Sequence, residues 1–211
     1  MTHENGQIGI DESGKGDYFG PLVIAGVYLS PEQDIQLQGV GVQDSKTLTD
    51  KRAATLSEYI RRRCRYTVVA IGPERYNSMY ASFKNLNRLL AWGHARAIEN
   101  LLEKVSCKRV IADQFGDERF LNSALMEKGR SIELIQKPRA EEDTAVAAAS
   151  IVARAEFLRQ LQDLGEKYSL PLPKGANAVI GVGKLFVRTH GRQALGQVAK
   201  LHFRTTQKVL C

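Results

Sequence analysis

The sequence predicts an α/β fold in which a mixed, five-stranded sheet is flanked by helices. Apolar β-type runs come first and then alternate with longer helical stretches, which is typical of such a sheet. The hydrophobic fraction of 43% is ordinary for a globular protein, so the 211 residues can bury a substantial core.

The predicted elements follow one another with short connections. The expected strands are Gln7–Asp11, Pro21–Leu29, Arg65–Gly72, Arg109–Asp113 and Ser131–Gln136. The expected helices are Asp50–Arg63, Asn85–Val105, Arg119–Lys128 and Thr144–Tyr168. Leu170–Gly183 is rich in Pro and Gly and is expected to be a loop before a helical tail at about 184–211. Because the chain has no internal repeat and no long linker, we expect one domain over residues 1–211, with the tail packed on it.

The composition restricts the class of protein. Lys and Arg number 30 against 23 Asp and Glu, a net charge of +7, which suits a polyanionic partner such as nucleic acid. A basic protein without such a partner has the same balance. The three cysteines are far apart and form no CxxC pair, which argues against a disulfide framework or a zinc site. The chain has neither a signal-peptide profile at its start nor an apolar run of about 20 residues, so we expect a cytoplasmic protein without membrane contact.

Acidic residues stand at three predicted element boundaries. Asp11 and Glu12 end the first strand, and Asp113 ends the strand that begins at Arg109. The run Glu141–Asp143 directly precedes the helix predicted to start at Thr144. Hard divalent cations prefer such oxygen ligands, and two of them about 4 Å apart can promote an in-line phosphoryl displacement. Convergence of these acids would therefore make a catalytic cation site.

Each acidic group also fits a purely structural role. Acids before a helix can simply favour the positive end of its dipole, and Asp113 can be an ordinary turn residue. The pair Asp11–Glu12 is harder to account for in this way, because Gly14 and Gly16 let the backbone approach a ligand closely. The segment from Gly9 to Lys15 matches GxxxxGK, but Gly16 follows where a P-loop needs Ser or Thr, so it is not a P-loop.

Several motifs resemble the type 2 ribonucleases H. The opening IGIDESGKGDYFGPLVIAGVYL is similar to theirs, and its GKG form resembles the ribonuclease HIII branch rather than the GRG of ribonuclease HII. Further similar blocks are DSKTL, YNSMYASFKNLNRLLAWGHARAIENLL, VIADQF, AVAAASIVAR, PKGA and AKLHF. These blocks span nearly the whole chain.

The resemblance implies a ribonuclease H-like fold and a set of four metal-binding carboxylates. Asp11, Glu12 and Asp113 match the first three of them. Glu141 matches the fourth, with Glu142 as the alternative. The implied cofactors are two divalent ions, Mg²⁺ or Mn²⁺, and we expect the protein to act as a monomer. The implied reaction is endonucleolytic hydrolysis of the RNA strand of RNA–DNA hybrids, leaving 5′-phosphate and 3′-hydroxyl ends.

The resemblance also implies substrate contacts. The backbone of Gly14, Lys15 and Gly16 resembles the loop that touches ribose 2′-hydroxyls, and Lys15 can neutralise a phosphate. The residues Asp44, Ser45 and Lys46 match a second substrate loop. Ser150 resembles a phosphate contact, although a small residue there can also serve helix packing.

Two departures from the family shape the expectations. Ribonuclease HIII proteins usually carry an N-terminal domain resembling a TATA-binding protein, whereas the first strand here begins at about Gln7. We therefore expect hybrid affinity to come from Lys15 and Lys46 near the site and from basic residues of the loop and tail: Lys174, Lys184, Arg188, Lys200, Arg204 and Lys208. A solvated surface without contact to nucleic acid is the alternative for the loop and tail. Second, no tyrosine follows Tyr168, so the tyrosine by which ribonuclease HII recognises RNA–DNA junctions is missing. Ribonuclease HII-type cleavage at single ribonucleotides and a non-catalytic hybrid-binding module are the rival hypotheses.

Overall fold

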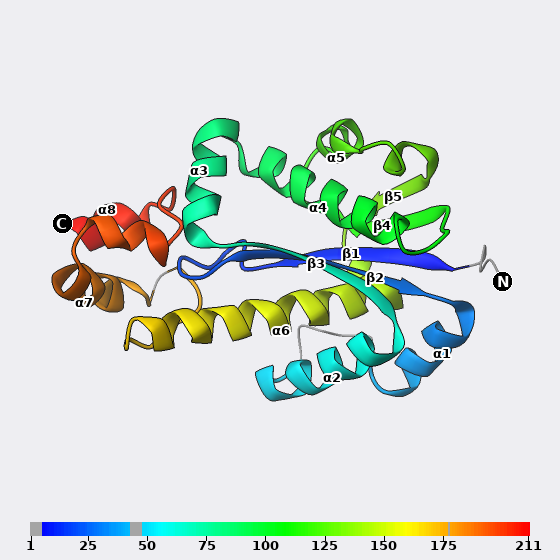
Figure 1. Ribbon diagram of the computed structural model, residues 1–211, viewed down its shortest axis with the longest axis horizontal. Coiled ribbons are helices and arrows are strands. Elements are labelled where there is room, and N and C mark those ends of the chain that lie inside the picture. The colour runs from blue at the N-terminus through cyan, green and yellow to red at the C-terminus, as the bar shows by residue number, and fades with distance from the viewer. Residues whose placement is uncertain (1–5, 43–47, 177) are drawn as a thin grey trace. The chain divides into compact units, whose positions relative to one another are not determined.

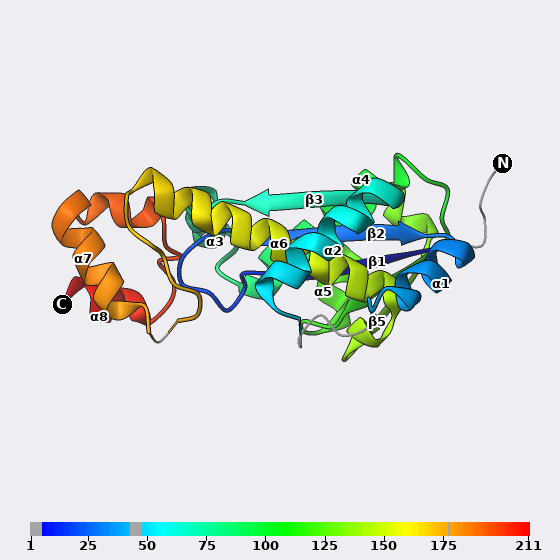
Figure 2. The ribbon, with the colours of Figure 1, turned by 90° about the horizontal axis from the view of Figure 1, so that it is seen from below.

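The computed structural model describes residues 6–42, 48–176 and 178–211. A five-stranded sheet has the order β3-β2-β1-β4-β5, and its strands are β1 (Gln7–Ser13), β2 (Leu22–Leu29), β3 (Arg65–Ile71), β4 (Arg109–Asp113) and β5 (Glu133–Lys137). β1 pairs with β4 and β4 with β5 in parallel, while β2 and β3 run in opposite directions in Figure 2. The predicted mixed sheet flanked by helices is confirmed.

Residue contacts divide the chain into two compact units. The first, called unit 1, comprises Met1–Glu12, Ile24–Val69 and Asn85–Ala155. The second, unit 2, comprises Ser13–Val23, Ala70–Lys84 and Glu156–Cys211. The single domain expected from the sequence stays a prediction.

Unit 1 holds most of the sheet between two groups of helices. In Figure 1, α4 (Leu86–Leu102) and α5 (Glu118–Ala124) lie on one face of the strands. The helices α1 (Pro31–Gly39) and α2 (Asp50–Arg63) lie on the other face, with the first part of α6 (Thr144–Lys167). Arg154 on α6 pairs with Asp50 at the start of α2 at 2.7 Å. The core between the layers is apolar and includes Ile8, Ile10, Ile24, Leu90, Ile98, Val110 and Val146, all fully buried.

Glycine allows one close approach that matters for the site. A Cβ at Gly9 in β1 would overlap the backbone of Ala145 and Val146 at the start of α6. Because Gly9 has no side chain, α6 packs directly on the strand that carries the first pair of acids. The sequence therefore brings the helix that begins at Thr144 close to the end of β1.

Unit 2 consists of the segment after β1 and the C-terminal helices. Its helices are α3 (Pro73–Phe83), the second part of α6, α7 (Ile180–His190) and α8 (Thr205–Leu210), with a 3₁₀ turn at Gln193–Gln197. A Cβ at Gly183 would overlap Val209, so α7 and α8 pack closely. The side chain of Asn77 on α3 donates to the carbonyls of Gly196 and Ala199 and accepts the N–H of Leu201. This one amide anchors the chain before α8.

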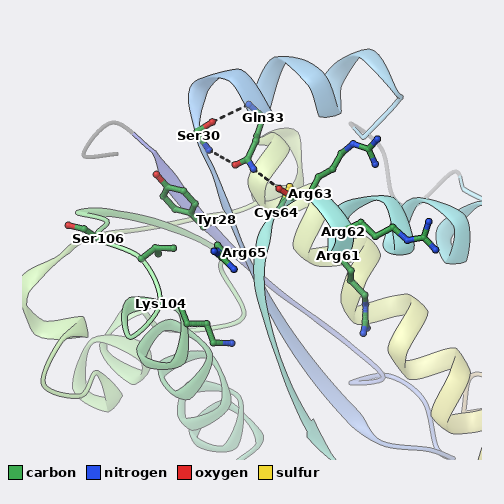
Figure 3. Close-up of a pocket in the computed structure, with 11 residues that line it drawn as sticks. Tyr28, Ser30, Gln33, Arg61, Arg62, Arg63, Cys64, Arg65, Lys104 and Ser106 are labelled. Atoms are coloured by element: carbon green, nitrogen blue, oxygen red, sulfur yellow. Dashed lines mark hydrogen bonds between the residues drawn. The ribbon is translucent and has the colours of Figure 1, made fainter. Parts of the chain in front are cut away.

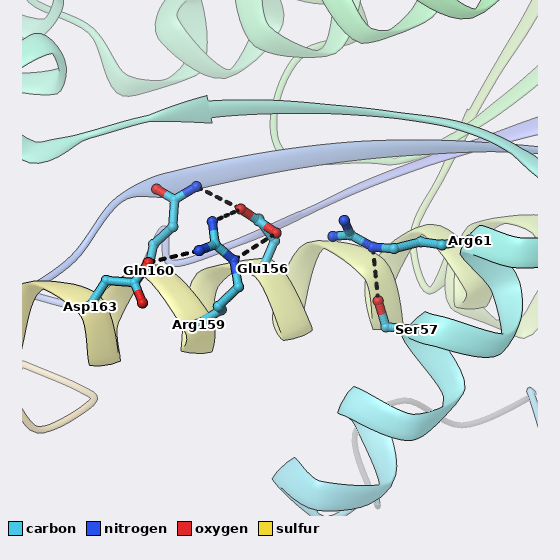
Figure 4. A network of polar contacts seen from close by, with 6 residues as sticks. All are labelled: Ser57, Arg61, Glu156, Arg159, Gln160 and Asp163. Atoms are coloured by element: carbon cyan, nitrogen blue, oxygen red, sulfur yellow. Dashed lines mark hydrogen bonds and ion pairs between the residues drawn. The ribbon is translucent and has the colours of Figure 1, made fainter.

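The surface of the long helix is polar where it belongs to unit 2. Figure 4 shows Arg159 between Glu156 and Asp163, at 2.6 and 2.7 Å, with Gln160 also bonded to Glu156. The same figure shows Arg61 on α2 in unit 1 bonded to Ser57 of its own helix at 3.3 Å. The exposed pair Arg159–Asp163 contributes little to stability and marks a solvated helix face.

Among the described residues, none of the helices is long and apolar enough to cross a bilayer.

The sequence patterns do not predict α1 and α3, and α7 begins at Ile180, inside the segment expected to be a loop. For α1, the capping box formed by Ser30 and Gln33 is present in the sequence. Only Leu37 of this helix is buried, so it has no apolar periodicity to reveal it.

Candidate active site

The end of β1 presents two adjacent carboxylates. Ile8 and Ile10 are fully buried, and the strand then emerges at Asp11 and Glu12, which are partly buried. An oxygen of Asp11 accepts the backbone N–H of Glu12 at 2.8 Å. The Glu12 side chain is only 8% exposed. The strand therefore withdraws two negative groups from water side by side, an arrangement that is costly unless something compensates the charge.

The third acid reaches the same edge of the sheet through strand pairing. In the parallel register Ile10 lies beside Ala112, so Asp11 and Asp113 each stand one residue further along. Asp113 is partly buried, and its Oδ1 accepts the N–H of Ala140 at 3.0 Å. Parallel strands thus bring together carboxylates that are about a hundred residues apart in sequence.

The pKa of Asp11 reflects its burial and the neighbouring carboxylates. Removal from water raises the pKa of Asp11 to about 8, and the negative charges of Glu12 and Asp113 also act to raise it. A hydrogen bond from Ser150 on α6 and the N–H of Glu12 act in the opposite direction. The site therefore carries more negative charge than its own hydrogen bonds stabilise.

The acids before α6 have separate surroundings. Asp143 accepts the N–H of Ala145 at 2.9 Å and the amide of Gln7 at 3.0 Å, so it serves as a helix cap and a strand contact. Glu142 is exposed. Glu141 is partly buried in the 3₁₀ turn Ala140–Glu142, directly after the residue whose N–H holds Asp113. The choice of Glu141 as the fourth carboxylate stays a prediction.

Within the described part of the chain, no three Asp, Glu, His or Cys side chains form a ready-made metal site. Asp11, Glu12 and Asp113 interact electrostatically, but their oxygens do not converge at ligand distance.

His94 is a site residue whose importance the sequence does not reveal. It lies on α4 with a fully buried side chain, and its Nε2 is 2.9 Å from Oε2 of Glu12. Its Nδ1 is buried and, among the described residues, has no hydrogen-bond partner. A proton on Nε2 satisfies both observations, because Nε2 then donates to Glu12 while Nδ1 buries only a lone pair. The ring also packs against Phe115, with centroids 4.8 Å apart. His94 thus fixes the orientation of Glu12.

The glycine-containing segment that follows Glu12 belongs to unit 2. Gly14 has a φ of +86°, and a Cβ there would overlap the carbonyl of Pro21, so only glycine fits. Gly16 is exposed with no atom within 4 Å of a Cβ placed on it, and Lys15 is partly buried. The exposed backbone at Gly16 leaves room for a ligand. The other predicted substrate loop, Asp44, Ser45 and Lys46, lies outside the described residues.

Lys200 corrects one expectation from the sequence. The basic tail predicts a surface contact between Lys200 and phosphate, yet its side chain is fully buried. Its Nζ donates to the carbonyls of Asp17 and Gly20, both at 2.8 Å, and burial lowers its pKa to about 7. Its backbone N–H donates to the carbonyl of Tyr18. Lys200 therefore holds the segment after the glycines and is not available to nucleic acid.

The remaining tail residues divide by exposure. Lys184, Arg188, Arg204 and Lys208 are exposed, as a contact with nucleic acid requires, and Lys174 in the preceding loop is at least partly exposed. His202 stacks on Tyr80 with ring centroids 4.3 Å apart and packs near Phe203. Its place in this aromatic cluster is sufficient to explain its presence.

Comparison with known proteins defines the class and then the branch. The model of the family described as Ribonuclease HII matches residues 8–206. A protein named Ribonuclease HIII from Protochlamydia amoebophila is 50% identical over 96% of this chain and 68% of its own length. One from Chlamydia felis is 45% identical over 96% of this chain and 69% of its own.

A solved structure extends the comparison to the fold. The crystal structure of Bst-RNase HIII in complex with Mn²⁺ is similar with a TM-score of 0.91 and 32% identity, covering 97% of this chain and 69% of that one. The chain therefore belongs to the ribonuclease HII family, and within it to the ribonuclease HIII proteins. The resemblance and the ribonuclease H-like fold expected from the sequence motifs are confirmed.

Proposed function

We propose that the chain is an endoribonuclease that hydrolyses the RNA strand of RNA–DNA hybrids and depends on divalent cations. The observation that carries the proposal is the group Asp11, Glu12 and Asp113 at one edge of the parallel strands, with the pKa of Asp11 raised to about 8. A surface meant only to hold phosphates gains nothing from such a group, because carboxylates repel phosphates. The family of the chain supports the same conclusion.

The donor set fits hard divalent cations. All the proposed ligands are carboxylates, and their mutual repulsion is relieved by positive charge. Asp11, Glu12, Asp113 and Glu141 would hold two ions, Mg²⁺ or Mn²⁺, and the similar Bst protein was crystallised with Mn²⁺. When bound, such ions lower the pKa of a water molecule and offset the charge that develops on phosphate.

The protein's own residues would orient the site and the substrate. His94 keeps the carboxylate of Glu12 in one orientation through its 2.9 Å contact, and Ser150 holds that of Asp11. The backbone of Gly14, Lys15 and Gly16 would approach the ribose 2′-hydroxyl, which distinguishes RNA from DNA. Lys15 and Ser150 would contact phosphate, and Asp44, Ser45 and Lys46 would belong to a second substrate loop. We also propose that the enzyme is monomeric and cytoplasmic.

The direct test is cleavage of an end-labelled RNA–DNA hybrid, with double-stranded RNA and double-stranded DNA as controls. We expect cleavage of the RNA strand of the hybrid alone, in Mg²⁺ or Mn²⁺, with 5′-phosphate products and no reaction in EDTA. Cleavage that persists in EDTA, or equal cleavage of double-stranded RNA, would contradict the proposal.

A second substrate separates the two branches of the family. Because the glycine loop has the GKG form and the similar proteins are named Ribonuclease HIII, we expect rapid cutting within runs of RNA and slow cutting at a lone ribonucleotide in DNA. Initial rates on the two substrates, measured with the same enzyme and ion, decide this. Comparable rates would place the activity with ribonuclease HII.

A further inference from the structure

A basic cavity lies in unit 1, away from the carboxylates. Its volume is about 760 Å³, and Figure 3 shows its lining from the end of β2, the turn from α2 into β3, and the loop after α4. Tyr28 in this lining lies directly against Gly6, which precedes β1, whereas Asp11 stands five residues further along. Gly6 and Asp11 are therefore separated by roughly 17 Å along the strand. The cavity is therefore at the opposite edge of the sheet from the proposed active site.

The lining is strongly cationic. Five basic residues contribute to it: Arg61, Arg62, Arg63, Arg65 and Lys104. Within the described part of the chain no Asp or Glu lines it, but the carboxylate of Glu32 lies beside it and accepts the hydroxyl of the lining residue Ser30 at 2.7 Å. Arg62 pairs with Glu58 at 3.9 Å, but the two side chains are 78% and 73% exposed, so the pair offsets little charge. Convergence of like charges around a cavity is unfavourable, and an anion inside it would relieve the repulsion.

Several of these cations are already held in place by neutral groups. The Arg63 guanidinium lies 3.9 Å from the centroid of Tyr59, and that of Arg61 lies 5.2 Å from the centroid of Tyr66. Lys104 donates to the carbonyl of Tyr66. These contacts restrict the side chains through groups that carry no charge of their own. Binding of an anion would thus lose less conformational entropy than at a surface with disordered lysines.

The turn that carries the arginines is also fixed. Gln33 of α1 donates to the carbonyl of Arg63 at 2.6 Å and accepts the N–H of Ser30, as the dashed lines in Figure 3 show. In the same view Arg65 and Lys104 lie on the Tyr28 side of the cavity, Arg62 points along α2 and Arg61 points away from α2. Arg65 and Lys104 are therefore the head groups best placed to meet a ligand beside Tyr28.

We propose that this cavity, the basic pocket, binds an anion that carries several phosphate groups. Guanidinium groups form paired hydrogen bonds with phosphate oxygens, and the volume is that of a site for a small ligand. Two sources share this chemistry: a compact polyphosphate, such as the phosphate chain of a nucleotide, and consecutive phosphates of a nucleic acid strand. The proposal does not depend on the proposed hydrolysis, because it uses none of the acids.

The test uses sodium tripolyphosphate as the probe, in metal-free buffer so that cation complexes do not interfere. Calorimetric titration and thermal unfolding are compared for the wild-type protein and for Arg65→Gln/Lys104→Gln. We expect saturable binding and a raised Tm for the wild type, and an affinity lower by about tenfold or more in the variant. Without ligand, the variant should unfold at the same or a higher temperature, because it removes repulsion. A merely structural role for these residues would lower that temperature.

A matched control keeps the change in net charge constant. Lys51→Gln/Arg96→Gln removes two exposed cations outside the pocket and should bind tripolyphosphate like the wild type. Equal losses in both variants would show attraction by net charge alone and overturn the proposal, as would the absence of binding to the wild type. Competition by oligothymidylate would identify strand phosphates as the source, and lack of competition would identify a compact polyphosphate.

Discussion

Asp11 in unit 1 and Lys200 in unit 2 are both ionisable side chains withdrawn from water, and their surroundings differ. The Lys200 ammonium donates to two carbonyls at 2.8 Å, so the protein itself supplies acceptors for it. Asp11 has the hydrogen bond of Ser150 but also faces the negative charges of Glu12 and Asp113. Burial lowers the pKa of Lys200 to about 7 and raises that of Asp11 to about 8.

The difference is that Lys200 has hydrogen-bond partners within the protein, whereas Asp11 faces like charges that a cation from outside would offset. Lys200 stabilises the local structure of unit 2, because its Nζ donates to two backbone carbonyls there. Asp11 stands among like charges, which is the condition under which a bound cation stabilises a site most. Substitutions at the two positions should therefore have opposite effects on stability.

The largest effect is expected for Asp11→Asn. Removal of one proposed metal ligand should lower the cleavage rate by on the order of a thousandfold or more. In metal-free buffer the same variant should be more stable than the wild type, because a neutral amide avoids both the cost of burying a charge and the repulsion from Glu12 and Asp113. Single-turnover cleavage and thermal unfolding in EDTA measure the two effects. Glu133→Gln, an exposed acid on β5, is the control and should change neither.

The effect of Asp11 on metal-free stability should also depend on pH in a defined direction. The folded-state pKa of Asp11 is about 8 and its ordinary value is 3.8, so the folded protein binds the proton more tightly. The Asp11 contribution to metal-free stability should therefore fall as the pH rises from about 4 to about 8. Urea unfolding of wild type and Asp11→Asn across this range isolates the contribution. Parallel stability curves for the two proteins would contradict the raised pKa of Asp11, which burial and then the charges of Glu12 and Asp113 cause.

A smaller loss of activity is expected for His94→Asn. His94 touches Glu12 and is not itself a proposed ligand, so its removal should disorder the carboxylate without deleting it. Residues in this position typically contribute about 10- to 100-fold to activity or metal affinity. We expect kcat to fall, KM for the hybrid to stay nearly constant and the required Mn²⁺ concentration to rise. His190→Ala, a change at an exposed histidine, is the control; a rise in KM alone in His94→Asn would contradict the positioning role.

Lys200→Met tests the other side of the comparison. The carbonyls of Asp17 and Gly20 would lose their donor, at a cost of about 1–3 kcal/mol in the free energy of unfolding. Because the pKa of Lys200 is about 7 when folded and 10.5 ordinarily, the folded protein holds this proton less tightly than the unfolded chain, and the Lys200 contribution to wild-type stability should rise between those pH values. The deficit of Lys200→Met should therefore be larger at pH 9 than at pH 7. Urea unfolding measures it, with the exposed Lys208→Met as the control, and an equal or smaller deficit at pH 9 would contradict the account.

The smallest effect concerns the exposed tail. Neutralising Arg188, Arg204 and Lys208 together should weaken hybrid binding and flatten its salt dependence, because fewer counterions are released. For every phosphate that the variant no longer neutralises, the slope of log K against log salt should become shallower by about 0.9. Binding titrations across a salt series measure this, and cleavage at saturating hybrid should change little. An unchanged slope with unchanged affinity would show that the tail does not touch nucleic acid.

Local sequence patterns predict the parts of the fold that repeat along the chain. α2 and β4 begin and end at the predicted residues, because apolar periodicity and capping residues define them. The acids at strand ends can be found because Asp11 and Asp113 each follow an apolar run. Such patterns do not predict α1, because only one of its residues is buried.

What the sequence could not predict depends on contacts between distant residues. His94 and Glu12 are 82 positions apart, and helical periodicity does not say which acid a buried histidine will face. Lys200 resembles any other basic residue of the tail. Lys200 is buried because the C-terminal part of the chain packs against Asp17 and Gly20. Local sequence patterns do not predict such a contact.

The most direct test of the central claim is the effect of Mn²⁺ on thermal unfolding, compared between the wild type and Asp11→Asn. If the negative charge around Asp11 is a cation site, Mn²⁺ should raise the wild-type Tm, with a size that follows from its concentration relative to Kd. The same concentration should raise the Tm of Asp11→Asn much less. Equal stabilisation of the two proteins by Mn²⁺, or none of either, would contradict the account.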